Sequence, residues 1–461
     1  MGAFRERDDF LKTAVHGKAE HVNVIRELLK PWSVTLTSSD EAEIVIAYGM
    51  KPLENKKTIV IPLDSADLEA YGKNLKPRVN RSGQRLSVAT GSSVVLTISP
   101  HMLYCYDEFF ESDQSDITTM ETKINDNLII LTLDVVREYS RILEDTLLSK
   151  SSDLYNLLTG LPLPYQKAPK WLRDLLMRTY KKPEGTALCN KLPLDALRYI
   201  LINAMENLSG RKIPRRMWNG KRYASMITHD IDTYRGLQRA GPIKKMEEKY
   251  DIPSAWYVPS KQYPLDTEII NTLANYGEVG AHGTRHDGEL TRVPEQKLVK
   301  SLREAKSALE NIIDCSVEGF RAPLLQHSPT ILRGLREADY NYDSSIPTWE
   351  PKHPRTMRSH GLGTVFPIFL DSIIEIPVSV VQDHQMLSVL GMGPKETMAA
   401  WLSMIATIRE IGGCCVLLSH PEYELFDKSN IAIYEGLLNI LTSDQKSWKT
   451  TPRELTYRIR E

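Results

Sequence analysis

The chain has 461 residues, which is too long for one ordinary hydrophobic core and predicts two or three domains. Its formal net charge of −1 gives no electrostatic reason to expect nucleic acid or an anionic membrane surface as a partner. Five cysteines without a CxxC pair, an amino terminus without an apolar signal core and the lack of any membrane-length apolar run predict a soluble, cytoplasmic protein.

Residues 1–105 are expected to form a small α/β or α+β domain. Apolar side chains recur at helical spacing between residues 10 and 30, so this segment is predicted to be a helix that ends before Pro31. Short runs typical of β-strands follow at 32–37, 43–48, 58–62, 86–90 and 93–98. Gly91-Ser92 separates the last two runs and predicts a hairpin turn. The sequence indicates no function for this domain.

Residues 106–215 are expected to form a mainly helical connector. Amphipathic helical patterns occur at 142–148, 171–180 and 194–208, with a proline-rich interruption at 161–169. The role of this segment is left open.

Residues 216–461 alternate between strand and helix patterns. Predicted strands lie at 223–227, 254–259, 277–281, 317–320 and 414–418, and predicted helices lie at 236–250, 267–276, 294–313, 329–338 and 398–411. This alternation favours βα units that form a parallel sheet or barrel.

Reactive side chains follow the carboxyl ends of four of these strands. They are Asp230 with Asp232, His282 with His286, Arg321 with Pro323, and His420. In α/β barrels the active site lies at that edge of the strands. The position of these residues therefore predicts that they converge on one site.

Two of these pairs have the spacing of metal ligands. Asp230 and Asp232 are two residues apart and would share one face of a strand. His282 and His286 would share one face if their segment formed a helical turn. A histidine pair with one aspartate provides three ligands and leaves an open position, which is the format of a catalytic zinc site. A solvated turn is the alternative for each pair taken alone.

From about residue 222 to the carboxyl terminus the chain resembles the polysaccharide deacetylases, the NodB-homology or family 4 carbohydrate esterases. The matching pieces are Thr228-His229-Asp230-Ile231-Asp232, His282-Gly283-Thr284-Arg285-His286, Arg321-Ala322-Pro323-Leu324, Tyr342-Asp343-Ser344-Ser345, Leu418-Ser419-His420 and Thr451-Pro452-Arg453-Glu454-Leu455. The first piece is the His-Asp-x-Asp variant of its motif. The resemblance implies a distorted (β/α) barrel that hydrolyses an acetamido group.

The resemblance also implies a role for each residue. Asp230 would be the general base, and Arg321 would orient it. Asp232, His282 and His286 would bind a divalent metal, zinc before cobalt, nickel or manganese, which lowers the pKa of a water and polarises the amide oxygen. The backbone N–H of Leu324 would stabilise the oxyanion, and His420 would protonate the leaving amine. Further candidates for substrate binding are Pro323, Asp343 and Trp349.

Several alternatives stay open at this stage. Either Asp343 or Asp371 could be the carboxylate that adjusts the pKa of His420. His229 could support the site residues from behind or be an ordinary buried histidine. The predicted activity is removal of an acetyl group from an N-acetylated sugar, a glycan or a related amide. The rivals are a hydrolase of the same barrel that acts on a cyclic ureide or another non-peptide C–N bond, a DxD glycosyltransferase, and a catalytically silent sugar-binding protein. The oligomeric state is not indicated.

Overall fold

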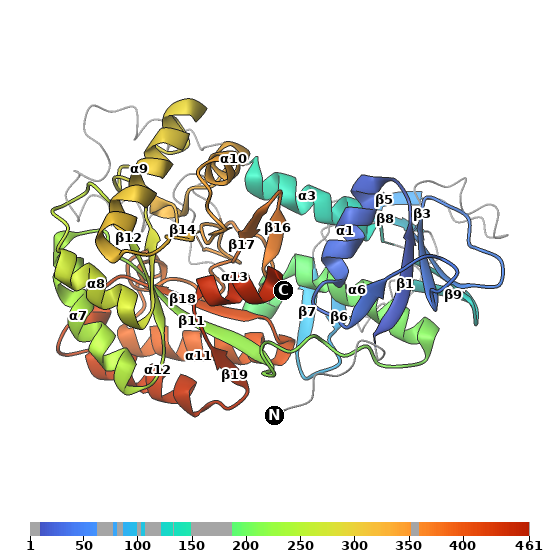
Figure 1. The fold of residues 1–461 in the computed structure, drawn as a ribbon. Coiled ribbons are helices and arrows are strands. Elements are labelled where there is room, and N and C mark those ends of the chain that lie inside the picture. Colours follow the sequence, from blue (N-terminus) through green and yellow to red (C-terminus); the bar gives the residue numbers. More distant parts are fainter. Residues whose placement is uncertain are drawn as a thin grey trace. The chain divides into compact units, whose positions relative to one another are not determined.

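The computed structural model describes residues 10–61, 77–80, 86–98, 103–106, 121–131, 133–148, 187–351 and 359–460. Two compact units emerge, one made of residues 1–144 and 189–217 and the other of residues 145–188 and 218–461 (Figure 1). The boundaries differ from those we expected, because the helix at 193–209 belongs with the first unit and does not stand in a separate connector. The helix expected at 171–180 and the proline-rich segment lie outside the described residues.

The first unit is built on a six-stranded sheet in the order β2-β1-β3-β4-β10-β9. All neighbouring strands are parallel except β9 and β10. The strands are β1 (Leu11–His16), β2 (Val34–Leu36), β3 (Ile44–Tyr48), β4 (Lys57–Ile61), β9 (Glu121–Asn125) and β10 (Leu128–Leu131). The helices in this part of the chain are α1 (Ala19–Leu29), α3 (Val135–Leu147) and α6 (Pro193–Ser209), with a 3-10 turn at Leu188–Lys191.

Two expectations for this unit have definite outcomes. The predicted helix at 10–30 is wrong in its first third, because Leu11 and Thr13 are buried while Lys12 is exposed, which is the two-residue period of a strand. The hairpin is confirmed, since β6 (Leu86–Ala89) pairs antiparallel with β7 (Val95–Ile98). Strands β5 (Pro77–Asn80) and β8 (Leu103–Tyr106) form a further antiparallel pair.

The second unit contains a curved parallel sheet in the order β16-β17-β15-β14-β13-β12-β11-β18, with β19 beside β11. Only β16 and β17 pair antiparallel. The strands are β11 (Tyr223–Asp230), β12 (Ser254–Val258), β13 (Glu278–Ala281), β14 (Gly319–Phe320), β15 (Tyr342–Asp343), β16 (Ile368–Leu370), β17 (Ile373–Glu375), β18 (Cys414–Ser419) and β19 (Ser447–Lys449).

The two ends of this sheet meet. The segment after β17 forms parallel bridges from Val378 to Pro347 and from Val380 to Leu417 of β18, so the chain closes the gap between β15 and β18. The result is the distorted (β/α) barrel that the sequence predicted. The closing segment has no regular strand of its own, which is why the barrel is irregular on that side.

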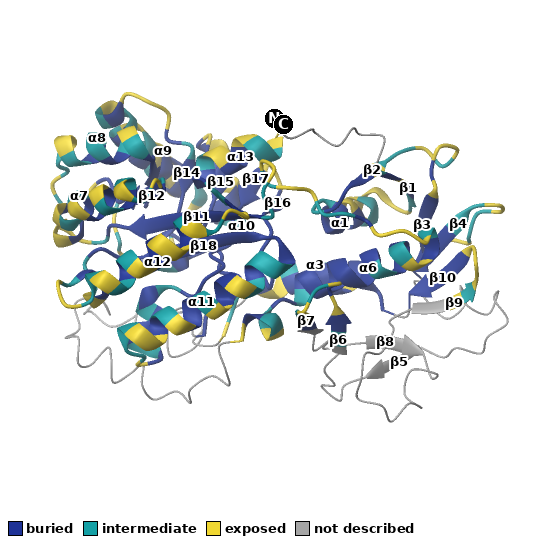
Figure 2. Ribbon diagram, turned by 90° about the horizontal axis from the view of Figure 1, so that it is seen from below, coloured by how far each residue is buried: buried dark blue, intermediate teal, exposed yellow. Residues whose placement is uncertain are grey.

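Helices cover the outside of this sheet, and their buried faces point inward while their outer faces are exposed (Figure 2). They are α7 (Tyr234–Lys249), α8 (Thr267–Tyr276), α9 (Glu295–Ile313), α10 (Pro329–Glu337), α11 (Pro394–Ile411), α12 (Ile431–Ser443) and α13 (Pro452–Arg460). Short helical turns lie at Pro323–Leu325, Gln385–Val389 and Glu424–Phe426. Within the described ranges, no helix combines the length and the apolar character needed to cross a membrane.

Candidate active site

Four strands of the barrel, β11, β13, β14 and β18, bring the predicted residues to one edge of the sheet. Asp230 is the last residue of β11, and His282, Arg321 and His420 come directly after β13, β14 and β18. These strands run parallel and lie within one continuous part of the sheet, so their carboxyl ends face the same side. The convergence expected from the sequence is thus built by strand order.

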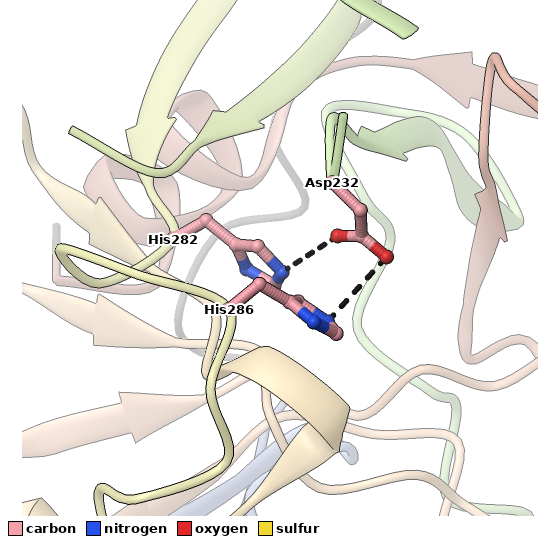
Figure 3. A group of neighbouring side chains, drawn as sticks. All are labelled: Asp232, His282 and His286. Atoms are coloured by element: carbon pink, nitrogen blue, oxygen red, sulfur yellow. Dashed lines mark ion pairs between the residues drawn. The ribbon is translucent and has the colours of Figure 1, made fainter. Parts of the chain in front are cut away.

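Asp232, His282 and His286 form a compact group (Figure 3). The Nε2 atom of His282 lies 3.2 Å from one carboxylate oxygen of Asp232, and the Nε2 atom of His286 lies 3.4 Å from the other. One ligand atom from each residue lies within 4.8 Å of the others, and this is the only such group of three found in the described parts of the chain.

The histidine pair reaches this group in a way that we did not expect. Residues 282–287 form an irregular loop rather than a helical turn. Gly283 has a φ of +71°, a conformation that favours glycine, and it turns the chain so that His286 comes back towards His282. The expected helical turn is wrong, although the two rings still face one carboxylate.

The hydrogen bonds fix the proton position on His282. Its Nδ1–H donates to the backbone carbonyl of Arg321 at 2.7 Å, so Nε2 is the ring atom that faces Asp232 and that would bind a metal ion in its unprotonated form. Neither this Nε2 nor Oδ1 of Asp232 has a hydrogen-bond partner among the described residues, although both atoms are buried. Buried acceptors that face each other are unfavourable without a cation between them. The donor set therefore fits a divalent metal ion.

Electrostatics favour an ionised Asp232. Burial would raise the pKa of its carboxyl group, but the nearby imidazoles of His286, His282 and His420 together hold that pKa below its usual value. An ionised carboxylate beside imidazole nitrogens is the arrangement that a zinc-type ligand set requires.

Asp230 lies beside this group and is held by a buried arginine. Nη1 of Arg321 lies 3.1 Å from Oδ1 of Asp230 and donates to Oγ1 of Thr228 at 2.8 Å. The guanidinium is fully buried and stacks over the ring of Tyr257 at 4.2 Å. Asp230 is only 2% exposed, and its other oxygen lies 3.9 Å from Nε2 of His282. The fixed positive charge of Arg321 therefore orients the Asp230 carboxylate towards the group formed by Asp232, His282 and His286.

His420 lies on the opposite flank and is held by Asp383. Its Nδ1 lies 2.7 Å from Oδ1 of Asp383, and its backbone N–H donates to Oδ2 at 2.8 Å. Burial alone would lower the pKa of His420, but the adjacent carboxylate of Asp383 raises it to about 10. The Nε2 atom of His420 lies 3.9 Å from Asp232. A protonated imidazole is thus directed at the site.

Both candidates that we named for tuning His420 are wrong. Asp371 is exposed and pairs with Arg336, and Asp343 bonds to Ser345. The sequence missed Asp383 because it follows the irregular closing segment after β17, where no periodic pattern marks a strand end.

The Arg321-Ala322-Pro323-Leu324 segment forms a tight turn next to the histidine loop. Leu324 and Leu325 have φ angles of 57° and 50°, which are strained for side chains of this size. The ring of Pro323 packs 3.6 Å from the position that a Cβ atom on Gly283 would take. The turn therefore holds the backbone of Leu324 in an unusual direction beside His282.

The remaining expected residues lie further from the ligands. Asp343 is completely buried, so it offers no surface for a substrate, which departs from our expectation of direct binding. Trp349 is 7% exposed, and its part in the acetyl pocket stays a prediction. His229 points to the other face of β11, where it bonds to Glu247 at 2.7 Å and Ser419 at 3.1 Å and stacks on Trp256.

Sequence reasoning also missed Glu422. Burial, followed by the charge of Asp232, raises the pKa of its carboxyl group to about 8. Its buried Oε2 lies 2.6 Å from the position of a Cβ atom on Gly236, so a side chain there would displace it. No motif marks this residue.

Comparisons with known proteins agree with this geometry. The family model for polysaccharide deacetylase matches residues 226–342. None of the proteins with curated functions matches the sequence.

Among solved structures, a Mycobacterium smegmatis protein assigned to the polysaccharide deacetylases is similar, with 21% identity and a TM-score of 0.46 over 53% of this chain and 93% of that one. An allantoinase aligns with 14% identity and a TM-score of 0.42 over 52% and 91% of the two chains. A family 4 acetyl xylan esterase from Clostridium thermocellum, solved with a cobalt ion, aligns with 16% identity and a TM-score of 0.34 over 51% and 91%.

Proposed function

Residues 226–342 form a domain of the polysaccharide deacetylases, hydrolases of non-peptide C–N bonds, and from this premise we propose that the protein is a metal-dependent N-deacetylase of an acetylated sugar. The observation that carries the proposal is the arrangement of the site. A three-residue ligand group lies between a carboxylate held by arginine and an imidazole held by aspartate. That arrangement provides a base on one flank and an acid on the other.

Asp232, His282 and His286 would hold the divalent ion, most simply zinc. When bound, the ion supplies Lewis acidity, which activates water and polarises the acetamide carbonyl group. The hydrogen bond from His282 to the carbonyl of Arg321 fixes the ring that would donate to the ion.

Asp230 is the proposed general base. Its carboxylate accepts the proton of the attacking water, and the Arg321 guanidinium keeps it correctly oriented. Arg321 is itself fixed by Thr228 and Ser344, so the base cannot rotate freely. Orientation of this kind lowers the entropic part of the barrier.

Leu324 and His420 would complete the reaction. The backbone N–H of Leu324 is the proposed donor to the oxyanion, and the positive φ angles of Leu324 and Leu325 support a special role for this turn. His420 then gives its proton to the amine nitrogen as the C–N bond breaks. The Asp383 carboxylate accepts the Nδ1–H of His420, so the proton that is transferred is the one on Nε2, and the products are acetate and a free amine.

A screen of acetate release tests the proposal. The purified protein, loaded with zinc, is incubated with N-acetylated monosaccharides, chitin oligosaccharides and nucleotide-linked N-acetyl sugars, and acetate is measured by an enzyme-coupled assay. We expect release with at least one of these classes and loss of release in Asp230→Asn. Ring opening of a cyclic ureide without acetate release from any sugar would contradict the proposal and favour the rival hydrolase.

A further inference from the structure

Two carboxyl groups lie side by side beneath the catalytic turn. Asp343 and Glu375 are in register on the parallel strands β15 and β17, and neither is exposed at all. One oxygen of each is already used: Oδ1 of Asp343 accepts from the Ser345 hydroxyl, and Oε1 of Glu375 accepts from the Ile346 N–H at 2.9 Å. The other oxygens, Oδ2 and Oε2, have no donor among the described residues.

A single proton would satisfy both of these oxygens. Two ionised carboxylates have only acceptors, so they cannot bond to each other. If Glu375 carries a proton, its hydroxyl donates to Asp343, and the two side chains form the hydrogen bond that their positions allow. Every oxygen of the pair then has a partner.

The surrounding charge supports the same arrangement. The charge of Arg321 acts on both Asp343 and Glu375, and its guanidinium also pairs with Asp230 at 3.1 Å. One positive charge cannot balance three buried carboxylates. Burial raises the pKa of Asp343 to about 7 and that of Glu375 well above its usual value, so a proton is retained near neutral pH.

Hydrogen bonds connect the pair to the catalytic turn. The Ser345 hydroxyl that donates to Asp343 accepts from the Ala322 N–H at 2.8 Å, one residue before Pro323. Next to it, the carbonyl and hydroxyl groups of Ser344 accept from Arg321 at 2.8 Å each, and that hydroxyl donates to the carbonyl of Ile376 at 2.8 Å. The pair is thus linked through Ser345 to the backbone that leads to Leu324, and the neighbouring Ser344 holds the guanidinium.

We propose that Asp343 and Glu375 share one proton and act as positioning residues for the turn that carries Arg321 and Leu324. Glu375 is the neutral donor, and Asp343 accepts two hydrogen bonds, one from Glu375 and one from Ser345. Ser345 in turn accepts a hydrogen bond from the Ala322 N–H. Neither residue touches the substrate. The catalytic consequence rests on the proposed function, whereas the shared proton does not.

Infrared spectroscopy tests the shared proton directly. The spectrum of the wild-type protein at pH 7 minus that of Glu375→Gln should contain the C=O stretch of a carboxylic acid, and the band should shift in D2O. Other buried acids are unchanged in the variant and cancel in the difference. A difference spectrum that shows a lost carboxylate band in place of an acid band would overturn the proposal, whether or not the protein has deacetylase activity.

Kinetics test the positioning role. In Glu375→Gln the amide N–H replaces the hydroxyl as donor to Asp343 and the amide oxygen still accepts from Ile346, so kcat should stay within about threefold of wild type. In Glu375→Met the donor is lost, and kcat should fall about tenfold or more while KM stays within about twofold. Equal impairment of the two variants would contradict the directional role. If Glu375→Met fails to fold, the infrared difference spectrum of Glu375→Gln still tests whether Asp343 and Glu375 share a proton.

Discussion

The two units of the molecule both contain parallel sheets, yet among the described residues only the second gathers a group of possible metal ligands at its strand ends. In the first unit, two polar side chains at strand ends have hydrogen-bond partners: His16 bonds to Ser39 at 2.5 Å, and the Tyr48 hydroxyl donates to Asp134 at 2.9 Å. In the second unit, Asp232 and His282 each keep a buried atom without a hydrogen-bond partner. A parallel sheet alone therefore does not create a metal site. The site is marked by the buried atoms of Asp232 and His282 that lack a hydrogen-bond partner.

The largest effect should come from the carboxylate next to the ligand group. Asp230→Asn removes the proposed base but keeps its shape, so kcat for acetate release should fall about 10³-fold or more. Asp134→Asn in the first unit is the matched control, because Asp134 is also a buried aspartate close behind a strand, and it accepts hydrogen bonds from the Tyr48 hydroxyl and the Arg137 N–H. Equal losses of kcat in the two variants would contradict the role of Asp230 as the general base.

We expect the second unit, which contains Asp232, His282 and His286, to bind zinc, and the first unit not to bind it. We expect about one zinc per chain in the wild type by inductively coupled plasma mass spectrometry, and at least about a hundredfold weaker binding in Asp232→Asn or His282→Gln. His16→Gln should bind zinc like the wild type, since His16 is satisfied by Ser39. Removal of zinc by a chelator should abolish activity, and added zinc should restore it.

A smaller loss is expected when the support of His420 is removed. Asp383→Asn cannot hold the imidazole through an ionic hydrogen bond, so kcat should fall about 10- to 100-fold. Asp371→Asn is the control, because Asp371 is exposed and pairs with Arg336 at the surface. A wild-type rate in Asp383→Asn would show that His420 is not the proton donor.

The smallest effect concerns stability and not activity. Glu350 is 2% exposed, accepts a hydrogen bond from Gln382, and has a pKa raised to about 8 by burial. Because the folded-state pKa lies above the ordinary 4.5, the unfolded chain loses this proton first as the pH rises, and stability falls between about pH 4.5 and 8.

Glu350→Gln removes this titration. Relative to the variant, the wild type should lose about 2 kcal/mol of unfolding free energy between about pH 6 and 7.5, at about 1.4 kcal/mol per pH unit. Urea unfolding at several pH values measures the difference. Parallel pH profiles for the two proteins would show that Glu350 is ionised in the folded state.

Several elements of the barrel could be predicted from the sequence, including β14 within the run at 317–320, whereas β15 could not. The helix predicted at 267–276 coincides with α8, and the strand predicted at 414–418 lies within β18. We did not predict the two-residue strand β15 (Tyr342–Asp343), because two residues carry no periodicity and such a strand exists only through its neighbours in the sheet. In the first unit, the segment at 11–16 was mistaken for helix because tertiary burial overrode its helical spacing.

The sequence by itself determined which residues could bind a metal, because Asp232, His282 and His286 lie next to recognisable strands and within specific motifs. Only the tertiary structure decided which side chains support them. Asp383 bonds to His420, and Glu375 bonds to Ile346 and lies beside Asp343, all of them partners that are distant in the chain. Local chemistry and spacing are written in the sequence, whereas contacts of this kind depend on how the sheet closes, which brings distant segments together only in the folded barrel.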